Sequence, residues 1–418
     1  MNPLNLPRLA ANVAARQLVV AVACALVAAC SSAPLVPEPP PPAPANPPAA
    51  VSRPPPEVII PAPTPSIIVP APTEVTPPAA IEPEPAALQL AAVGDIMLGG
   101  SAAPELRREG YDYPFALVRP ILGQADVVFG NLEGPLTDAG QAEPNKRYVF
   151  RSPPAKVAPV LAAAGFTVVS LANNHTMDYG VEGLKQTIAA LDGVGIQHAG
   201  AGMNQQQARR PAFVRSGDYT LGFLAYSLTF PKSFWAQGQR PGTAFGHASH
   251  VRADVAAARE QADVVVVSFH WGREATTELR DYQSKLAHTA IDSGATVVLG
   301  HHPHILQGIE QYKNGIILYS LGNFVFGSYS RKATRSIIAL LNLQGAKVSE
   351  VRLIPVSVDN IELVFQPQPL VGEQANEVIA ELKRLSKPLS TTIMAVNGVG
   401  LVQLSGQTDQ RLLSEQEY

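Results

Sequence analysis

The stretch Ala295-Thr296-Val297-Val298-Leu299-Gly300-His301-His302-Pro303-His304 decides the fold class. Its apolar half has the length and composition of a buried β-strand that is bounded by glycine. Three of the nine histidines follow immediately, where the strand gives way to a loop. Ligands of α/β proteins bind at the carboxyl edge of the sheet, and imidazole is the commonest protein metal ligand. The stretch therefore indicates an α/β protein with a metal site at a strand end, and a histidine-rich surface turn is the alternative.

The rest of the chain from residue 88 onward repeats the same kind of pattern. Apolar runs alternate with stretches rich in Ala and Leu, which is typical of a layered α/β fold. Strands are expected at Leu88–Val93, Ala125–Phe129, Thr167–Leu171, Tyr219–Ala225, Asp263–Phe269, Ala295–Leu299 and Ile316–Tyr319. Helices are expected at Ala155–Ala164, Val181–Val194, Arg252–Glu260 and Leu279–Ser293. A hairpin turn is expected at Tyr312-Lys313-Asn314-Gly315-Ile316, because Asn-Gly tolerates the positive φ that such turns need.

Ligand-type side chains follow five of the expected strands. They are Asp95, the Asn131-Leu132-Glu133 run, the Asn173-Asn174-His175 run, His270 and the His-Pro-His loop. Each has a simpler explanation alone: Asp95 could cap a turn, Asn174 could accept a positive φ, and His270 could be a core histidine. Together they favour a metal site. Mixed carboxylate, imidazole and amide ligands suit Mn, Fe or Zn better than Ca or Mg, and a bridging carboxylate would permit two ions.

The N-terminus has the features of an export signal. Residues 1–29 contain Arg8 and Arg16, no acidic residue, and an apolar run of about a dozen residues, shorter than the ~20 that span a bilayer. The sequence Leu26-Val27-Ala28-Ala29-Cys30-Ser31-Ser32 resembles a bacterial lipobox, in which Cys30 would carry the lipid. An ordinary secretory signal and an uncleaved anchor are the alternatives.

Cysteine usage and charge agree with an exported lipoprotein. The chain has two cysteines, Cys24 inside the signal and Cys30 at the lipobox, so the mature chain would have no thiol left for a disulfide. Removal of residues 1–29 leaves 29 basic and 34 acidic side chains, a formal charge of −5. This balance gives no indication of nucleic-acid binding.

A proline-rich segment follows the lipobox. Of the 39 prolines, 21 lie between Pro34 and Pro85, interleaved with Ala, Val and Glu. Such a composition cannot bury a core, so residues 30–87 are expected to form an extended, disordered tether. A proline-rich ligand for a partner domain is the alternative.

Six motifs, in this order, resemble the CapA family of capsule synthesis proteins, a branch of the calcineurin-like metallophosphoesterases. They are Val93-Gly94-Asp95, Asn131-Leu132-Glu133, Leu171-Ala172-Asn173-Asn174-His175-Thr176, His270-Trp271-Gly272, Gly300-His301-His302-Pro303-His304 and Tyr319-Ser320-Leu321-Gly322-Asn323-Phe324. The resemblance covers Leu88 to Phe326 and implies a four-layer α/β/β/α metallophosphoesterase-like sandwich with metals at one rim.

The resemblance also implies a ligand set by motif position. Its members are Asp95, Glu133, Asn174, His270, His302 and His304. Asp95 and His304 would bind one ion, Glu133 would bridge, and the remaining three would bind a second ion. The implied cofactor is one or two divalent transition-metal ions, Mn, Fe or Zn.

The implied catalytic pair is His175, as proton donor to the leaving group, with Asp178 orienting its ring. Two positions depart from the wider superfamily, which has His where Met97 stands and Asp where Glu133 stands. A thioether is a poor ligand for such an ion, so Met97 leaves the first metal position one ligand short. The CapA branch commonly lacks this His.

These motifs and compositional changes predict a division of the chain into four segments. They are a lipoprotein signal at 1–29, the tether at 30–87, the CapA-like domain at 88–330, and a C-terminal extension at 331–418 packed on the sandwich. Within the extension, strands are expected at Ser336–Leu343 and Lys347–Val356, with a turn at Gln344-Gly345, and a helix at Glu373–Leu385.

The family's association with poly-γ-glutamate capsule synthesis or export implies two hypotheses. The first is an envelope-anchored, metal-dependent hydrolase, lipid-anchored on the periplasmic side in the outer membrane, that acts on an anionic polymer with the capsule machinery as partner. The second is a non-catalytic accessory factor for polymer export with a structural metal site. His175 favours the first and Met97 the second. Cationic side chains that could meet a polyanion are Arg147, Arg151, Arg273 and Arg331.

Overall fold

The computed structural model describes residues 87–405, all within one compact unit, Ala79–Tyr418. The predicted signal segment, the lipidation site at Cys30 and the proline-rich segment up to residue 86 lie outside the described residues. Among the residues that are described, none of the helices has both the length and the apolar character needed to cross a membrane.

The first sheet has ten strands and contains the N-terminal strand of the fold near its middle. Its order is β17-β18-β15-β14-β1-β2-β3-β4, with β13 also paired to β1 and β16 to β15. The bounds are β1 Leu88–Met97, β2 Val127–Leu132, β3 Val168–Ser170, β4 Gln197–Ala199, β13 Asn323–Phe326, β14 Arg335–Gln344, β15 Lys347–Ser357, β16 Gln368–Pro369, β17 Ile393–Val396 and β18 Val399–Val402. Strands β1 to β4 are parallel, as is β13 to β1.

The second sheet has six strands in the order β11-β12-β10-β9-β7-β6. The bounds are β6 Ala212–Ser216, β7 Tyr219–Ser227, β9 Val264–His270, β10 Val297–His301, β11 Ile309–Tyr312 and β12 Gly315–Leu318. The four inner strands are parallel and the two edge strands antiparallel. A separate two-stranded pair is formed by β5 Ala201–Gly202 and β8 Gly242–Thr243.

The helices lie in the connections between the strands. They are α1 Ala103–Glu109, α2 Arg119–Leu122, α3 Pro154–Ala163, α4 Gly180–Asp192, α5 Gln205–Ala208, α6 Ala248–Arg259, α7 Asp281–Asp292 and α8 Gly372–Ser386. Short 3₁₀ turns lie at Gly100–Ala102, Tyr113–Phe115, Lys232–Phe234 and Lys387–Leu389. The expected helices in this region are confirmed to within a few residues at each end.

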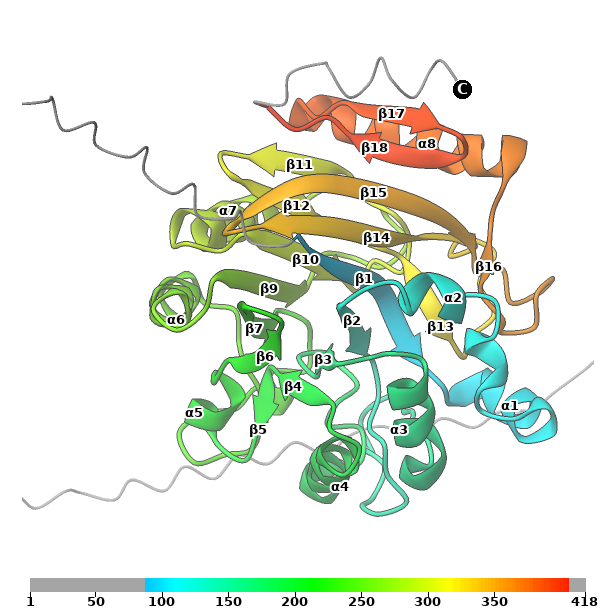
Figure 1. Cartoon of the computed structure of the whole chain (residues 1–418). Helices are drawn as coiled ribbons and strands as arrows, with labels where there is room; N and C mark the ends of the chain where they lie inside the picture. The colour runs from blue at the N-terminus through cyan, green and yellow to red at the C-terminus, as the bar shows by residue number, and fades with distance from the viewer. Residues whose placement is uncertain (1–86, 406–418) are drawn as a thin grey trace, which may run out of the picture. The chain divides into compact units, whose positions relative to one another are not determined.

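Three apolar clusters define the layers. The inner cluster fills the space between the two sheets, where Phe129 of β2 stacks on Phe223 of β7 with ring centroids 5.6 Å apart. A second cluster joins the outer face of the first sheet to α1 to α4, and a third joins the outer face of the second sheet to α6 and α7. Figure 1 shows α6 and α7 on one side of the sandwich and α3 and α4 on the other. The expected α/β/β/α sandwich is confirmed.

Strand β9 shows why these segments are continuous apolar runs in the sequence. Successive strand residues point to opposite faces. Val264 and Val266 therefore enter the inner cluster, while Val265 and Val267 pack under the helices. A strand that is covered on both faces needs apolar residues at every position. Polar and apolar residues therefore do not alternate along such a strand. It appears in the sequence as the continuous apolar run from which the strand was predicted.

The C-terminal residues are integrated into the first sheet. Strands β14 and β15 form the expected antiparallel hairpin, and β14 pairs directly with β1. Helix α8, also expected, buries Val378, Ile379 and Leu382 in the cluster between the sheets. Strands β17 and β18, for which the sequence analysis made no prediction, extend the edge of the sheet beside α8 (Figure 1).

Two local expectations differ from the structure. The expected hairpin turn is present between β11 and β12, but its left-handed residue is Lys313, with φ 52°, and not Asn314 or Gly315. Several strands also run further than their apolar segments: β1 continues to Met97 and β10 to His301. The backbone hydrogen bonds of a parallel ladder do not depend on side-chain polarity, so pairing continues into the polar residues that the apolar pattern excludes.

Candidate metal centre

The carboxyl ends of the parallel strands bring the expected ligands together. Asp95 lies near the end of β1, Glu133 directly after β2, and His270 at the end of β9. Gly94 permits this convergence. A Cβ on Gly94 would lie 2.0 Å from the Gly322 carbonyl oxygen, so only glycine lets the backbones approach and the Asp95 N–H donate to that oxygen at 3.0 Å.

One group of ligand atoms comes from Asp95, Glu133 and His304. The three side chains each offer an atom within 4.8 Å of the others. Nδ1 of His304 lies 3.1 Å from Oδ2 of Asp95, and Nε2 of the same ring lies 3.9 Å from Oε1 of Glu133. This is the arrangement expected of a first metal position.

A second group comes from Glu133, His270 and His302. Nε2 of His270 lies 3.7 Å from Oε1 of Glu133 and 2.7 Å from Oδ1 of Asn174. The rings of His270 and His302 have their centroids 4.7 Å apart. Glu133 belongs to both groups, which is what a bridging carboxylate requires. The ligand assignment itself stays a prediction.

The residues fit a metal on physical grounds. Buried atoms without a hydrogen-bond partner among the described residues include Oε1 of Glu133, Nδ1 of His302 and both ring nitrogens of His301. An unsatisfied buried polar atom costs about 1–3 kcal/mol, so such atoms are expected to have a function. Two of them are ligand-type atoms of the groups described above. The carboxylate and imidazole donors suit Mn, Fe or Zn.

Charges in the centre shift the pKa values in opposite directions. Burial alone would raise the pKa of Asp95, but the nearby imidazoles of His301 and His304 hold it well below the usual range. Burial and the nearby Asp95 charge raise the pKa of Glu133 well above its usual range. Burial would lower the pKa of His304, but Glu133 and Asp95 raise it to about 9. Burial and the charge of His304 lower the pKa of His302 to about 3.

His175 and Asp178 form a pair beside the ligand groups. Both side chains are almost fully buried, and Nδ1 of His175 lies 2.7 Å from Oδ2 of Asp178. The ring of His175 also packs on Phe150, with centroids 4.7 Å apart. Nε2 of His175 makes no hydrogen bond with the described residues. Burial lowers the pKa of His175, while Asp178 opposes the shift.

Lys146 completes this pair and was missed by the sequence analysis. Its ammonium group lies 2.9 Å from Nδ1 of His175 and donates to Asp178 and to the backbone carbonyl of Asn174. Lys146 comes from the loop between β2 and α3, 29 residues before His175 in the chain. Burial lowers the pKa of Lys146, and the charge of Asp178 opposes the shift.

A chain of amides positions the centre and was also unassigned from the sequence. Asn131 donates to Oδ1 of Asp95 at 2.9 Å and lies 3.3 Å from Nδ1 of His270. Its own oxygen accepts from Asn173 at 3.2 Å, and Asn173 accepts from the His175 backbone at 3.0 Å. Asn131 and Asn173 both lie in motifs that resemble the capsule synthesis family. Their position in these motifs was the sequence signal that could have identified them.

Two other sequence features have clear locations. Met97 is 1% exposed and packs against Gly134 and Gly100, outside the groups of candidate ligands. The four arginines that could meet a polyanion are all exposed and lie in loops that follow β2, β9 and β13. The guanidinium groups of Arg147 and Arg151 stack over Tyr148 and Tyr179, at 5.1 and 4.8 Å from the ring centroids.

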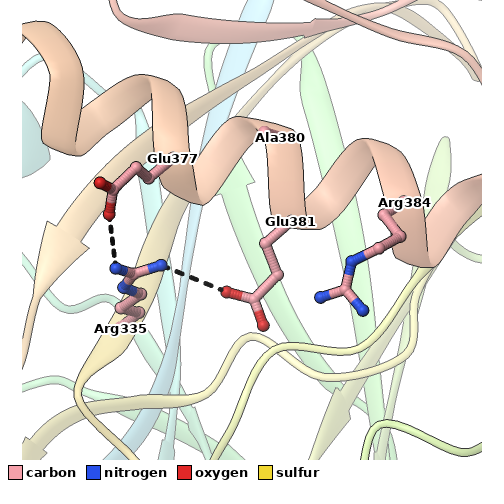
Figure 2. A pocket seen from close by; sticks show the side chains of 5 residues that line it. All are labelled: Arg335, Glu377, Ala380, Glu381 and Arg384. Carbon is pink, nitrogen blue, oxygen red and sulfur yellow. Dashed lines mark hydrogen bonds and ion pairs between the residues drawn. The ribbon is translucent and has the colours of Figure 1, made fainter.

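A surface hollow on α8 provides a contrast with this centre. Figure 2 shows Arg335 between Glu377 and Glu381, and the salt bridge to Glu377 measures 2.6 Å. These side chains are substantially exposed, so their ion pairs contribute little free energy. None of the residues that line the hollow belongs to the ligand groups.

Comparisons with solved structures found distant similarities. The NAD nucleotidase of Haemophilus influenzae aligns with a TM-score of 0.41 at 11% identity, over 72% of this chain and 56% of that chain. A 5'-nucleotidase precursor of Thermus thermophilus aligns with a TM-score of 0.35 at 15% identity, over 68% of this chain and 54% of that chain. This chain spans just over half the length of both structures.

Comparisons of sequence are closer. Residues 89–328 match the family described as Bacterial capsule synthesis protein PGA_cap. The capsule biosynthesis protein CapA of Bacillus anthracis is 32% identical over 71% of this chain and 73% of that protein. The PGA biosynthesis protein CapA of Bacillus subtilis is 32% identical over 65% of this chain and 72% of that protein. The match covers more than half of the chain and contains every residue of the candidate metal centre, and this chain therefore belongs to the bacterial capsule synthesis protein family.

Proposed function

We propose that this protein is a metal-dependent hydrolase that acts on an anionic polymer, poly-γ-glutamate, during capsule synthesis or export. The observation that carries the proposal is Glu133, which is shared by two groups of ligand atoms beside a His–Asp pair that belongs to neither group. The relatives from Bacillus species are named for capsule and PGA biosynthesis, which supports the choice of polymer.

The chain's own residues have distinct roles in this reaction. Divalent ions, when bound, would polarise an oxygen of the scissile group. Glu133 would hold both ions, with Asp95 and His304 on one side and Asn174, His270 and His302 on the other. Asp178 and Lys146 hold the His175 ring through Nδ1. In the imidazolium form, Nδ1–H donates to Asp178 and the second proton lies on Nε2, and this second proton is the one that would pass to the leaving group.

The same proposal includes an envelope location. The lipobox-like sequence that ends in Cys30 supports a lipid-anchored protein on the periplasmic side, in the outer membrane, with the capsule machinery as partner. Fractionation of cells that produce Cys30→Ser tests this location. The variant is expected to leave the membrane fraction or to accumulate unprocessed, and a variant that fractionates as the wild type does would contradict it.

A non-catalytic accessory role in polymer export is the second candidate, because Met97 stands where a metal ligand is usual. A turnover assay distinguishes the hydrolase from the accessory role. Purified wild-type protein is assayed with poly-γ-glutamate and with a generic phosphodiester, each with and without added Mn²⁺. Metal-dependent cleavage that is lost in His175→Ala supports the hydrolase. A His175→Ala variant that restores a capsule-defective strain as well as the wild type supports the accessory role.

A further inference from the structure

We propose that Glu274 is a further metal ligand, on the solvent side of the centre, that binds together with His302 and His304. The inference rests on the metal centre of the proposed function. The Glu274 carboxylate and the two imidazoles each offer an atom within 4.8 Å of the others. His302 belongs to one of the ligand groups described above and His304 to the other, so Glu274 reaches both.

The backbone holds Glu274 in this place. The N–H of the next residue, Ala275, donates to the carbonyl oxygen of Pro303 at 2.9 Å, between the two histidines. The side chain of Gln307 donates to the Thr276 carbonyl oxygen at 3.0 Å. These bonds tie the loop that follows β9 to the loop that follows β10, and therefore keep Glu274 over the two imidazoles.

Backbone strain is concentrated at the same contact. Ala275, His302 and His304 have φ values of 53°, 92° and 59°, in the region that favours glycine. A residue in a sparsely populated conformation costs about 1–3 kcal/mol, and such residues cluster at ligand clamps and active sites. All three strained residues lie in the two loops that present Glu274 and the imidazoles, which indicates that this geometry has a function.

The carboxylate has no competing partner in the part of the chain that the structure describes. Glu274 is exposed and makes no hydrogen bond or ion pair with any residue in the range 87–405. An exposed unpaired carboxylate is common and alone indicates nothing. Here it lies against His302, whose side chain is 9% exposed and whose Nδ1 has no hydrogen-bond partner among the described residues. A metal ion between the Glu274 carboxylate and the His302 imidazole would give both groups a partner.

Glu274 would also supply a ligand to a metal position that has too few. The position formed by Asp95, Glu133 and His304 lacks the histidine that Met97 replaces. Glu274 places an additional oxygen donor next to His304, and oxygen donors suit Mn and Fe better than a thioether does. The buried Glu133 would thus bind the metal ion from the protein interior, and the exposed Glu274 would bind it from the solvent-facing side.

Metal titration of the full chain tests the inference. Metal-stripped wild type, Glu274→Gln and Glu274→Ala are titrated with Mn²⁺ and with Co²⁺ by calorimetry, and the visible absorption of bound Co²⁺ is recorded. Loss of an outer-shell partner costs ~10–100-fold in metal affinity, so loss of a ligand is expected to cost at least that much. The Co²⁺ spectrum is expected to change in both variants.

Glu278→Gln is the matched control, because Glu278 is an exposed acid in the same loop. It is expected to bind both metals as the wild type does. The inference is overturned if Glu274→Ala binds with unchanged affinity and spectrum, or if Glu278→Gln weakens binding equally, since the effect is then one of net charge. A wild type that binds neither metal refutes the proposed function itself, and the two failures are therefore distinguishable.

Discussion

Replacement of His175 by alanine separates proton transfer from metal binding. Nδ1 of the side chain contacts Asp178 and Lys146, and the ring packs on Phe150. Asp178 retains two partners in the variant, Lys146 and the Phe150 N–H, so no buried charge is left unpaired. We therefore expect a loss of about 1–3 kcal/mol in the free energy of unfolding, which leaves the protein folded.

The effect on turnover should be much larger. Loss of a general acid costs ~10²–10⁴ in rate, which corresponds to about 3–5 kcal/mol of transition-state free energy. The assay measures the shortening of poly-γ-glutamate chains and the cleavage of a phosphodiester, next to the metal content of the same samples. The His175→Ala variant is expected to keep its metal. The neighbouring Asn174→Ala variant is expected to lose metal and activity together.

Retained turnover in His175→Ala would refute the assigned role, because Nε2 of His175 is the atom to which proton transfer is assigned. Loss of metal in that variant would also refute it, since His175 belongs to neither ligand group. A fall in activity without a fall in metal content is the result that the geometry requires.

Three further perturbations test other parts of the account. Lys146→Ala should lower the melting temperature and turnover, because buried Asp178 and a backbone carbonyl each lose one donor at a cost of about 1–3 kcal/mol, whereas Lys156→Ala, at an exposed position of α3, should change neither. Glu133→Gln should lower metal content at both positions, measured by elemental analysis, because both ligand groups include Glu133; an unchanged content contradicts the bridging role. Gly94→Ala should lower thermal stability by more than about 1 kcal/mol, since its Cβ would lie 2.0 Å from a carbonyl oxygen; an unchanged melting curve contradicts the close approach.

The part of the site that sits on strand ends is predictable from the sequence. Asp95, Glu133 and His270 each follow an apolar strand, and parallel strands of one sheet end at the same edge. The apolar pattern and the position of these residues are therefore enough to predict their convergence. Their division between the two sheets is not predictable in this way, because strand order depends on crossover connections that no local pattern specifies. The family resemblance implied two sheets, and the assignment of each strand to its sheet comes from the structure.

Lys146 and Glu274 could not be predicted for a different reason. Both lie in loops, and neither belongs to a motif at a strand end. Lys146 reaches His175 because its loop folds back over the segment after β3, as the 2.8 Å bond from the Phe150 N–H to Asp178 shows. Such contacts arise from tertiary packing, and the loop composition is that of any exposed connection.

Metal analysis of purified full-length protein tests the central claim most directly. The wild type is expected to contain, or to take up on addition, Mn, Fe or Zn at one or two ions per chain. His270→Ala and His302→Ala should each lower both the metal content and the melting temperature, because each leaves the ion short of a ligand. A wild-type protein that is fully folded without metal, and that takes up none of the three ions, would contradict the entire arrangement of ligands.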